Sequence, residues 1–129
     1  MREKEKIIIT SSIFNGVTSE EFKLLEYCKK RGDWLIVGLH SDLWLYTCSG
    51  ITKLDVATRR RMLSWFPMID EIFTFNDTDG TVCHLLNLVK KCYPNSNTTY
   101  IGISDMQNKP EFKVTGIHFE HNQTITRKT

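Results

Sequence analysis

The sequence lacks both a long hydrophobic segment and an excess of charge of one sign. Its uninterrupted apolar runs are only a few residues long, far short of the ~20 residues that span a bilayer, so no membrane-spanning helix is expected. The 17 Lys and Arg nearly balance the 15 Asp and Glu, which disfavours a protein that coats nucleic acid. The charged first residues are not followed by an apolar region as long as that of a signal peptide, so no secretory signal is expected.

Cysteine and histidine are present, but their spacing does not suggest a metal site. The four cysteines are Cys28, Cys48, Cys83 and Cys92. They form no C-x-x-C pair, so we expect reduced core residues in a cytoplasmic protein rather than a zinc or redox motif. His118 and His121 form an H-x-x-H pair, but two ligands are too few for a closed metal site. We therefore predict no metal site built from protein ligands.

Signature motifs of several large enzyme classes are also missing. A single glycine, Gly16, follows the first apolar run, in place of the G-x-G-x-x-G pattern of dinucleotide-binding proteins. The chain has neither a Walker phosphate loop nor a G-x-S-x-G nucleophile elbow. The sequence therefore does not indicate a dinucleotide-binding protein, a P-loop nucleotide hydrolase or a serine hydrolase of the nucleophile-elbow type.

Short apolar runs alternate with segments of helical periodicity. We expect strands over residues 7–9, 34–39, 71–75, 99–103 and 114–119. We expect helices over residues 18–31, 55–66 and 82–93, and a mixed connection over residues 43–54. Runs that are apolar on both faces and alternate with helices are typical of a parallel sheet between helical layers. The sequence therefore predicts an α/β fold, with one Rossmann-like parallel sheet in a single domain over residues 1–129.

The segments that follow the predicted strands are the places to look for a ligand, because open parallel sheets bind ligands beyond the carboxyl ends of their strands. The segment after the first strand ends in Thr18-Ser-Glu-Glu21, which fits a helix capping box. A helix N-terminus attracts phosphate, but Glu20 and Glu21 place negative charge there. Both acids are therefore expected to disfavour a polyphosphate.

Arg59, Arg60 and Arg61 form a basic run on the second predicted helix. Three consecutive helical residues spread over about 200°, so the three side chains cannot share one direction. We expect at least two of them to belong to a solvated face. One, aimed at the strand ends, could bind phosphate with its fork of donors.

Several motifs in order resemble the cytidylyltransferase family, particularly its glycerol-3-phosphate cytidylyltransferases and heptose-phosphate adenylyltransferases. Residues 6–15 (KIIITSSIFN) and 32–42 (GDWLIVGLHSD) resemble the family's first two strands and the loops after them. Residues 57–63 (ATRRRML) resemble its E-x-R-x-x-x-L helix, and residues 69–72 (IDEI) its V-D-E-V exit. Asp105, followed by KPEF at residues 109–112, resembles a G-x-D-x-x-x-P-E stretch. The resemblance spans about residues 6–127.

The resemblance implies the H-x-G-H type of nucleotidyltransferase fold and a nucleotide site in the loops. An active member would move CMP or AMP from CTP or ATP with Mg²⁺ to a phosphorylated sugar or polyol, with release of pyrophosphate. The positions implied for the reaction are Thr18, Glu21, Lys53 and Arg59. Those implied for nucleotide binding are Ser12, Ile13, Phe14, Asn15, Arg59, Asp105, Thr124, Thr126 and Arg127.

The departures from the family pattern fall on the reaction centre. The family's H-x-G-H reads Thr18-Ser-Glu-Glu21 here, so both histidines are replaced. Asn15 stands in place of an aspartate, and Ser12 in place of a glycine. Loss of electrostatic donors in such a site costs about 10²–10³ in rate per group. These changes favour a divergent member with reduced or lost transfer that still binds a nucleotide or a protein.

Two other interpretations stay open. The chain could be a working nucleotidyltransferase in which Lys53, Arg59 and Arg127 supply the positive charge. It could instead bind nucleic acid through its arginines, with Trp44 and Tyr46 stacking on bases, although the near-neutral charge argues against this. Relatives are often homodimers, and the apolar stretch Leu43-Trp-Leu-Tyr46 suits such an interface.

Overall fold

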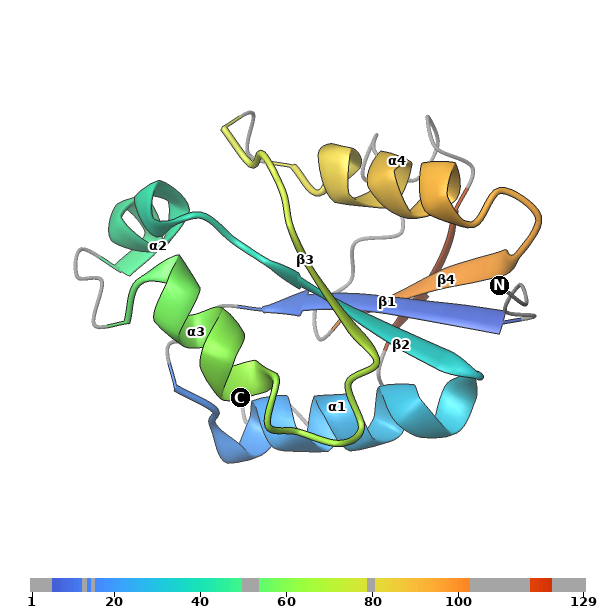
Figure 1. Cartoon of the computed structure of the whole chain (residues 1–129), viewed down its shortest axis with the longest axis horizontal. Coiled ribbons are helices and arrows are strands. Elements are labelled where there is room, and N and C mark those ends of the chain that lie inside the picture. The colour runs from blue at the N-terminus through green and yellow to red at the C-terminus, as the bar shows by residue number, and fades with distance from the viewer. Residues whose placement is uncertain are drawn as a thin grey trace.

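The computed structural model describes residues 6–12, 14, 16–49, 54–78, 81–102 and 117–121. The strands are β1 (Lys6–Ser12), β2 (Trp34–Leu39), β3 (Glu71–Thr74), β4 (Asn97–Gly102) and β5 (His118–His121). The helices are α1 (Ser19–Arg31), α2 (Asp42–Ser49), α3 (Val56–Leu63) and α4 (Cys83–Cys92). Figure 1 shows the strands crossing the middle of the molecule between helices. Within the described ranges, no helix is long and apolar enough to cross a membrane.

The five strands form one sheet in the order β3-β2-β1-β4-β5. Each neighbouring pair is parallel, which confirms the predicted α/β, Rossmann-like sheet. From β1 the chain adds β2 and β3 on one side and β4 and β5 on the other. The order therefore reverses between β1 and β4, and a reversal of this kind is where open parallel sheets bind ligands.

Alternate residues of the strands supply two hydrophobic layers. Ile7 and Ile9 pack with Leu85 and Leu86 of α4 on one face of the sheet. Ile8 packs on the other face, in a cluster that includes Leu24 and Leu25 of α1 and Leu63 of α3. Figure 1 shows α1 and α3 on one side of the sheet and α4 on the other. A strand that is buried on both faces needs apolar residues at successive positions, as the Ile7-Ile-Ile9 run predicts.

Helix α2 corrects the prediction of a mixed connection over residues 43–54. The first part of that segment is helical, because α2 covers Asp42–Ser49. The Ser41 hydroxyl accepts a hydrogen bond from the Trp44 backbone N–H at 3.1 Å, which is how serine caps a helix start. Leu45 is fully buried, so one apolar residue of the segment anchors the helix. The capping role of Ser41 is the signal that the sequence reading missed.

The expectation that the cysteines are core residues is correct for Cys28 and wrong for Cys92. Cys28 is buried and Cys92 is exposed, and both are free thiols. Burial raises the pKa of the Cys28 thiol to about 12, so this side chain stays protonated and serves as a small core residue. The predicted fifth strand is present as β5 at His118–His121, while residues 114–116 lie outside the described residues.

Close packing of β2 against α4 makes Gly38 sensitive to substitution. A Cβ atom at this position would lie 2.4 Å from Cδ2 of Leu85. We expect Gly38→Ala to displace Leu85 and to lower the free energy of unfolding by about 1–3 kcal/mol, as overpacking typically does. Urea denaturation measures the effect. In a Leu85→Ala background the same substitution should cost less, and an equal cost in both backgrounds would contradict the proposed clash.

Candidate functional site

Two polar clusters lie at the carboxyl edge of the sheet, on opposite faces. The Glu21 cluster comprises Ser12, Phe14, Thr18 and Glu21, on the face covered by α1 and α3. The His40 cluster comprises His40, Ser41, Trp44 and Asp77, on the face covered by α4. Because all strands are parallel, the segments after β1, β2 and β3 lie at the same edge of the sheet. These segments supply most of the residues of the two clusters.

The start of α1 organises one half of the Glu21 cluster. Thr18 is the N-cap, and its hydroxyl accepts from the Glu21 backbone N–H at 3.1 Å. In return, Oε1 of Glu21 accepts from the Thr18 backbone N–H at 3.1 Å. This reciprocal pair is the predicted capping box, which the structure confirms.

The second oxygen of the same carboxylate reaches back to the loop after β1. Oε2 of Glu21 accepts from the Ser12 hydroxyl at 2.7 Å and from the Phe14 backbone N–H at 2.9 Å. Glu21 is only 6% exposed, and Phe14 holds the left-handed value φ 50 with its ring fully buried. An anion from the chain itself therefore occupies hydrogen-bond donors of a loop that leads into a helix N-terminus, a place that favours anions.

The two acids of the capping segment thus have different roles. Glu20 is exposed, whereas Glu21 is turned inward and bonded to the loop. The sequence predicted the capping role of Glu21, but not that its second oxygen bonds to the loop after β1. The difference follows from helical geometry, because Glu21 is the third residue of the helix, from which a side chain reaches back to the N-cap.

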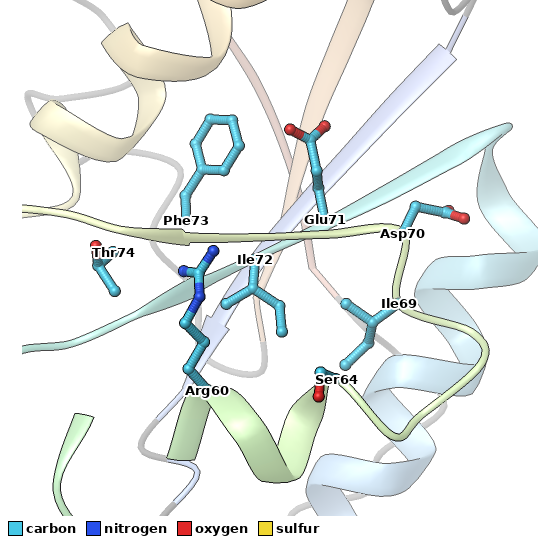
Figure 2. Close-up of a pocket in the computed structure, with 8 residues that line it drawn as sticks. All are labelled: Arg60, Ser64, Ile69, Asp70, Glu71, Ile72, Phe73 and Thr74. Atoms are coloured by element: carbon cyan, nitrogen blue, oxygen red, sulfur yellow. The ribbon is translucent and has the colours of Figure 1, made fainter. Parts of the chain in front are cut away.

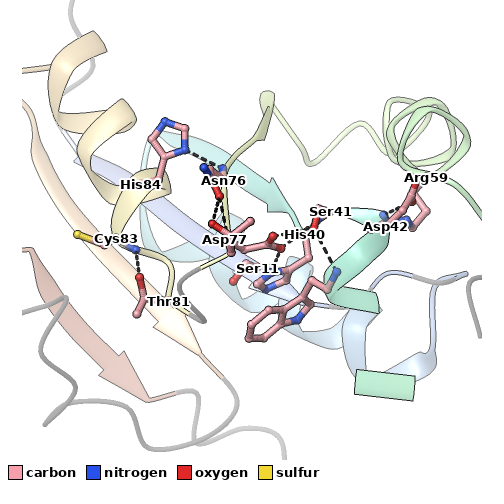
Figure 3. Close-up of polar contacts among 12 residues, drawn as sticks. Ser11, His40, Ser41, Asp42, Arg59, Asn76, Asp77, Thr81, Cys83 and His84 are labelled. Carbon is pink, nitrogen blue, oxygen red and sulfur yellow. Dashed lines mark hydrogen bonds and ion pairs between the residues drawn. The ribbon is translucent and has the colours of Figure 1, made fainter. Parts of the chain in front are cut away.

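Arg59 is fully buried on α3. Its Nη2 lies 3.0 Å from Oδ1 of Asp42 (Figure 3). Its Nε donates to the Leu54 carbonyl at 3.1 Å. Arg60 and Arg61 are exposed, as expected for at least two of the three arginines. The guanidinium of Arg59 therefore joins α3 to the start of α2, and its phosphate-binding role stays a prediction.

The structure brings part of the predicted site together. Ser12, Phe14, Thr18 and Glu21 form one cluster, while Arg59 pairs with Asp42. The remaining predicted positions lie outside the described residues: Ile13, Asn15, Lys53, Asp105, Thr124, Thr126 and Arg127. No group of three or more His, Cys, Asp or Glu side chains suited to a metal ion occurs in the described part of the chain.

The sequence pointed to the segments after the strands, residues 40–53 and 76–80 among them, but it did not predict that His40 pairs with Asp77. His40 follows β2 directly, and its Nδ1 lies 2.9 Å from Oδ2 of Asp77, which comes after β3. Asp77 also accepts from the Ser41 backbone N–H at 2.9 Å and from the Ser41 hydroxyl at 2.6 Å (Figure 3). The ring of His40 stacks on Trp44 with centroids 4.8 Å apart. The position of both residues after neighbouring parallel strands is what brings them together.

The environment sets the charges of this pair. Burial raises the pKa of the Asp77 carboxyl, but hydrogen bonds from Ser41 and His40 outweigh it, so the net pKa is lowered. Burial lowers the pKa of His40 more than the hydrogen bond to Asp77 raises it. At neutral pH the pair is therefore an ionised carboxylate beside a neutral imidazole. The carboxylate can only accept, so Nδ1 of His40 carries the proton.

A separate cavity of about 600 Å³ lies along the edge strand β3 and is lined by residues that include Arg60, Ile72 and Phe73 (Figure 2). The carboxylate of Asp70, at the margin of the cavity, accepts hydrogen bonds from Lys29 Nζ and from the Leu35 backbone N–H, both at 2.7 Å. This cavity runs beside β3 and contains none of the residues of the two polar clusters.

Comparison with known proteins supports the fold and not a specific activity. No family model and no curated protein matches the chain. It is similar to the lipopolysaccharide core biosynthesis protein from Thermoplasma volcanium GSS1, with 18% identity, a TM-score of 0.65, and coverage of 92% of this chain and 93% of that one. It is also similar to a bifunctional NMN adenylyltransferase/ADP ribose pyrophosphatase from Francisella tularensis, with 12% identity, a TM-score of 0.68, and coverage of 92% and 37%. The chain therefore has a nucleotidyltransferase-like fold.

The His40 cluster predicts how stability changes with pH. The unfolded chain binds a proton at His40 below about pH 6.5, whereas the folded chain resists this because its His40 pKa is lowered. The contribution of His40 is therefore complete above that pH and is lost as the pH falls. We expect His40→Asn to flatten the pH dependence of the unfolding free energy between about pH 5 and 7, by at most about 1.4 kcal/mol per pH unit.

Urea denaturation across this range measures the slope. His118→Asn, which removes an exposed histidine, is the matched control. If His40→Asn and the wild-type protein have the same slope, the burial of a neutral His40 is contradicted.

Proposed function

We propose that this chain is a nucleotidyltransferase-like protein in which nucleotidyl transfer is reduced or lost, and which retains binding of a nucleotide or of a protein partner. The observation that carries the proposal is the position of the Glu21 carboxylate, which accepts hydrogen bonds from Ser12, Phe14 and Thr18. In this chain the loop after β1 is thus already bound to an anion.

The energetics disfavour a triphosphate in the same place. Two negative charges ~4–6 Å apart repel by order 1 kcal/mol or more at the dielectric of a protein surface. A phosphate would also have to displace Glu21 from the Ser12 hydroxyl and the Phe14 N–H. Thr18 and Glu21 further supply no cationic imidazole to neutralise charge on a reacting phosphate. Thr18 and Glu21 in place of two histidines would therefore weaken both the binding of the triphosphate and the transfer reaction.

The alternative is a working transferase that receives Mg²⁺ together with CTP or ATP and passes CMP or AMP to a phosphorylated sugar or polyol. In that case Lys53, Arg59 and Arg127 would carry the positive charge. To bind a phosphate oxygen, the Arg59 guanidinium would have to give up its ion pair with Asp42, whose carboxylate lies 3.0 Å away. The ion pair that Arg59 already makes therefore favours loss of transfer over this alternative.

A homodimer in the cytoplasm is also part of the proposal. The side chains of Leu43 and Tyr46 on α2 are 64% and 61% exposed. Exposed apolar residues on one short helix are suited to contact with another protein surface. The related prediction of nucleic-acid stacking by Trp44 is less favoured, because the Trp44 ring stacks on His40.

The first test is a pyrophosphate-release assay with CTP or ATP, Mg²⁺, and a phosphorylated acceptor such as glycerol-3-phosphate. We expect release no faster than in the absence of protein, because the loop donors and the two histidine positions are altered. Acceptor-dependent release that disappears in Arg59→Ala would establish the working-enzyme alternative instead.

The second test removes the internal anion. Glu21→Ala frees the Ser12 hydroxyl and the Phe14 N–H, and we expect it to cost about 1–3 kcal/mol of stability because buried donors lose their partner. We also expect pyrophosphate to raise the melting temperature of Glu21→Ala more than that of the wild-type protein, since ligand binding to the folded state stabilises it.

Glu20→Ala is the matched control, because it removes an equal charge from the same helix turn at an exposed position. An equal gain in pyrophosphate binding for both variants would mean that general charge, and not occupation of the loop, limits binding. No gain for Glu21→Ala would show that the loop has no residual anion site.

A further inference from the structure

The outer edge of β3 carries backbone groups that, within the described residues, no other strand pairs with. β3 is the last strand of the sheet and pairs with β2 alone. Leu35 of β2 directs both its N–H and its carbonyl toward Asp70, just before β3. These directions alternate along a strand, so Val37 also faces β3. Val37 is opposite Ile72, and in a parallel pair its bonds go to the residues on either side, so the N–H and carbonyl of Ile72 point away from the sheet.

The cavity of about 600 Å³ beside β3 lies along this open edge. Its lining residues are Arg60 and Ser64, at the end of α3, and residues 69–74, and none of them belongs to β2. The cavity is therefore on the outer side of β3. An extended peptide segment suits such an edge, because its own backbone donors and acceptors continue the hydrogen-bond ladder.

The two faces of β3 offer different side chains to an added strand. Ile72 packs with the layer under α1 and α3, whereas Phe73 packs with the layer under α4. Arg60 is exposed on α3, and its side chain approaches β3 from the side of Ile72 (Figure 2). Side chains on the same face of neighbouring strands interact. An added strand therefore meets a cation on the α3 side and an aromatic ring on the α4 side.

The charges along the cavity favour an acidic partner over a second copy of this strand. The Arg60 guanidinium makes no ion pair within the described residues. Both acids that line the cavity are occupied, because Asp70 accepts from Lys29 and Glu71 accepts from Trp34 Nε1 at 2.8 Å. The β3 strand of a second copy would thus bring no free carboxylate to Arg60. An acidic residue of a different chain would, through a charge-assisted hydrogen bond.

We propose that the open edge of β3 binds an extended segment of another protein in which acidic and apolar residues alternate. The acidic side chains face Arg60, the apolar side chains face Phe73, and the backbone of the segment bonds to the N–H and carbonyl of Ile72. The cavity contains no residue of the Glu21 cluster, so this site does not depend on loss of nucleotidyl transfer or on nucleotide binding.

Amide NMR with a designed peptide tests the site. The probe is VEVEVEV, an acetylated and amidated peptide, and VKVKVKV is its matched control. We expect VEVEVEV to move the Ile72 amide resonance saturably and to slow its exchange with solvent, because the outward N–H gains an acceptor. The amide of Ile9, on β1 inside the sheet, should not move. VKVKVKV should bind at least about fivefold more weakly, the effect of about 1 kcal/mol.

N-methylation of the peptide tests whether it binds as a strand. Backbone N–H groups alternate in direction, so either those of the glutamates or those of the valines face β3. We expect methylation of one set to abolish binding and methylation of the other set to leave binding unchanged. Equal effects of the two methylated peptides would mean contact through side chains alone and would contradict pairing with the edge.

Charge reversal at Arg60 tests the preference for acidic side chains. We expect Arg60→Glu to weaken binding of VEVEVEV and to strengthen binding of VKVKVKV, each at least about fivefold, because the exchanged charges restore attraction only with lysine. Arg61→Glu is the matched control, since Arg61 is exposed on the same helix but does not line the cavity. This control should bind both peptides as the wild-type protein does.

Three results would each overturn the proposal. The first is that VEVEVEV at millimolar concentration leaves the Ile72 amide resonance in place. The second is that Arg60→Glu and Arg61→Glu bind VEVEVEV equally well. The third is movement of the Ile72 resonance with protein concentration in the absence of peptide, which would assign the edge to a second copy of the chain. None of these results bears on pyrophosphate release or on pyrophosphate binding by Glu21→Ala, so failure here is distinguishable from failure of the proposed function.

Discussion

Parallel pairing of β1 with both β2 and β4 is the constraint on which the rest of the structure depends. It buries Ile7, Ile8 and Ile9 completely, and it directs the carboxyl ends of the strands to one edge. Helices must then cover both faces, because neither face of this strand tolerates water. The polar residues that follow the strands are concentrated at that edge as a consequence.

Two buried carboxylates, those of Glu21 and Asp77, lie on opposite faces of the sheet at this edge, and different donors stabilise each of them. On the α1 side, the Glu21 carboxylate receives hydrogen bonds from a hydroxyl and from backbone N–H groups. On the α4 side, the Asp77 carboxylate is held by Ser41 and His40. Buried acids are stable only when such donors compensate for lost hydration. The first arrangement occupies the Ser12 hydroxyl and the Phe14 N–H, and the second fixes the His40 ring beside Asp77.

Similarity of fold does not establish an activity for this chain. The likeness to the two solved structures lies at 12–18% identity, a level at which the course of the backbone persists while the chemistry of the loops changes. Glu21 at this position does not disturb the sheet, because its carboxylate caps the helix start on which it lies. In this fold, the donors of the loop after β1 are therefore bound by a carboxylate of the chain itself.

The sequence by itself determined the parallel sheet, its two helical layers and the capping box, because apolar periodicity and helix-start chemistry are local signals. It also indicated that the H-x-G-H histidines are absent. It did not reveal α2, whose cap depends on Ser41, or the burial of Arg59 against Asp42. Only the tertiary structure decided that Oε2 of Glu21 bonds to Ser12 and Phe14, and that His40 meets Asp77. His40 and Asp77 are 37 residues apart, and contacts across such a separation follow from strand register and burial, which no local pattern encodes.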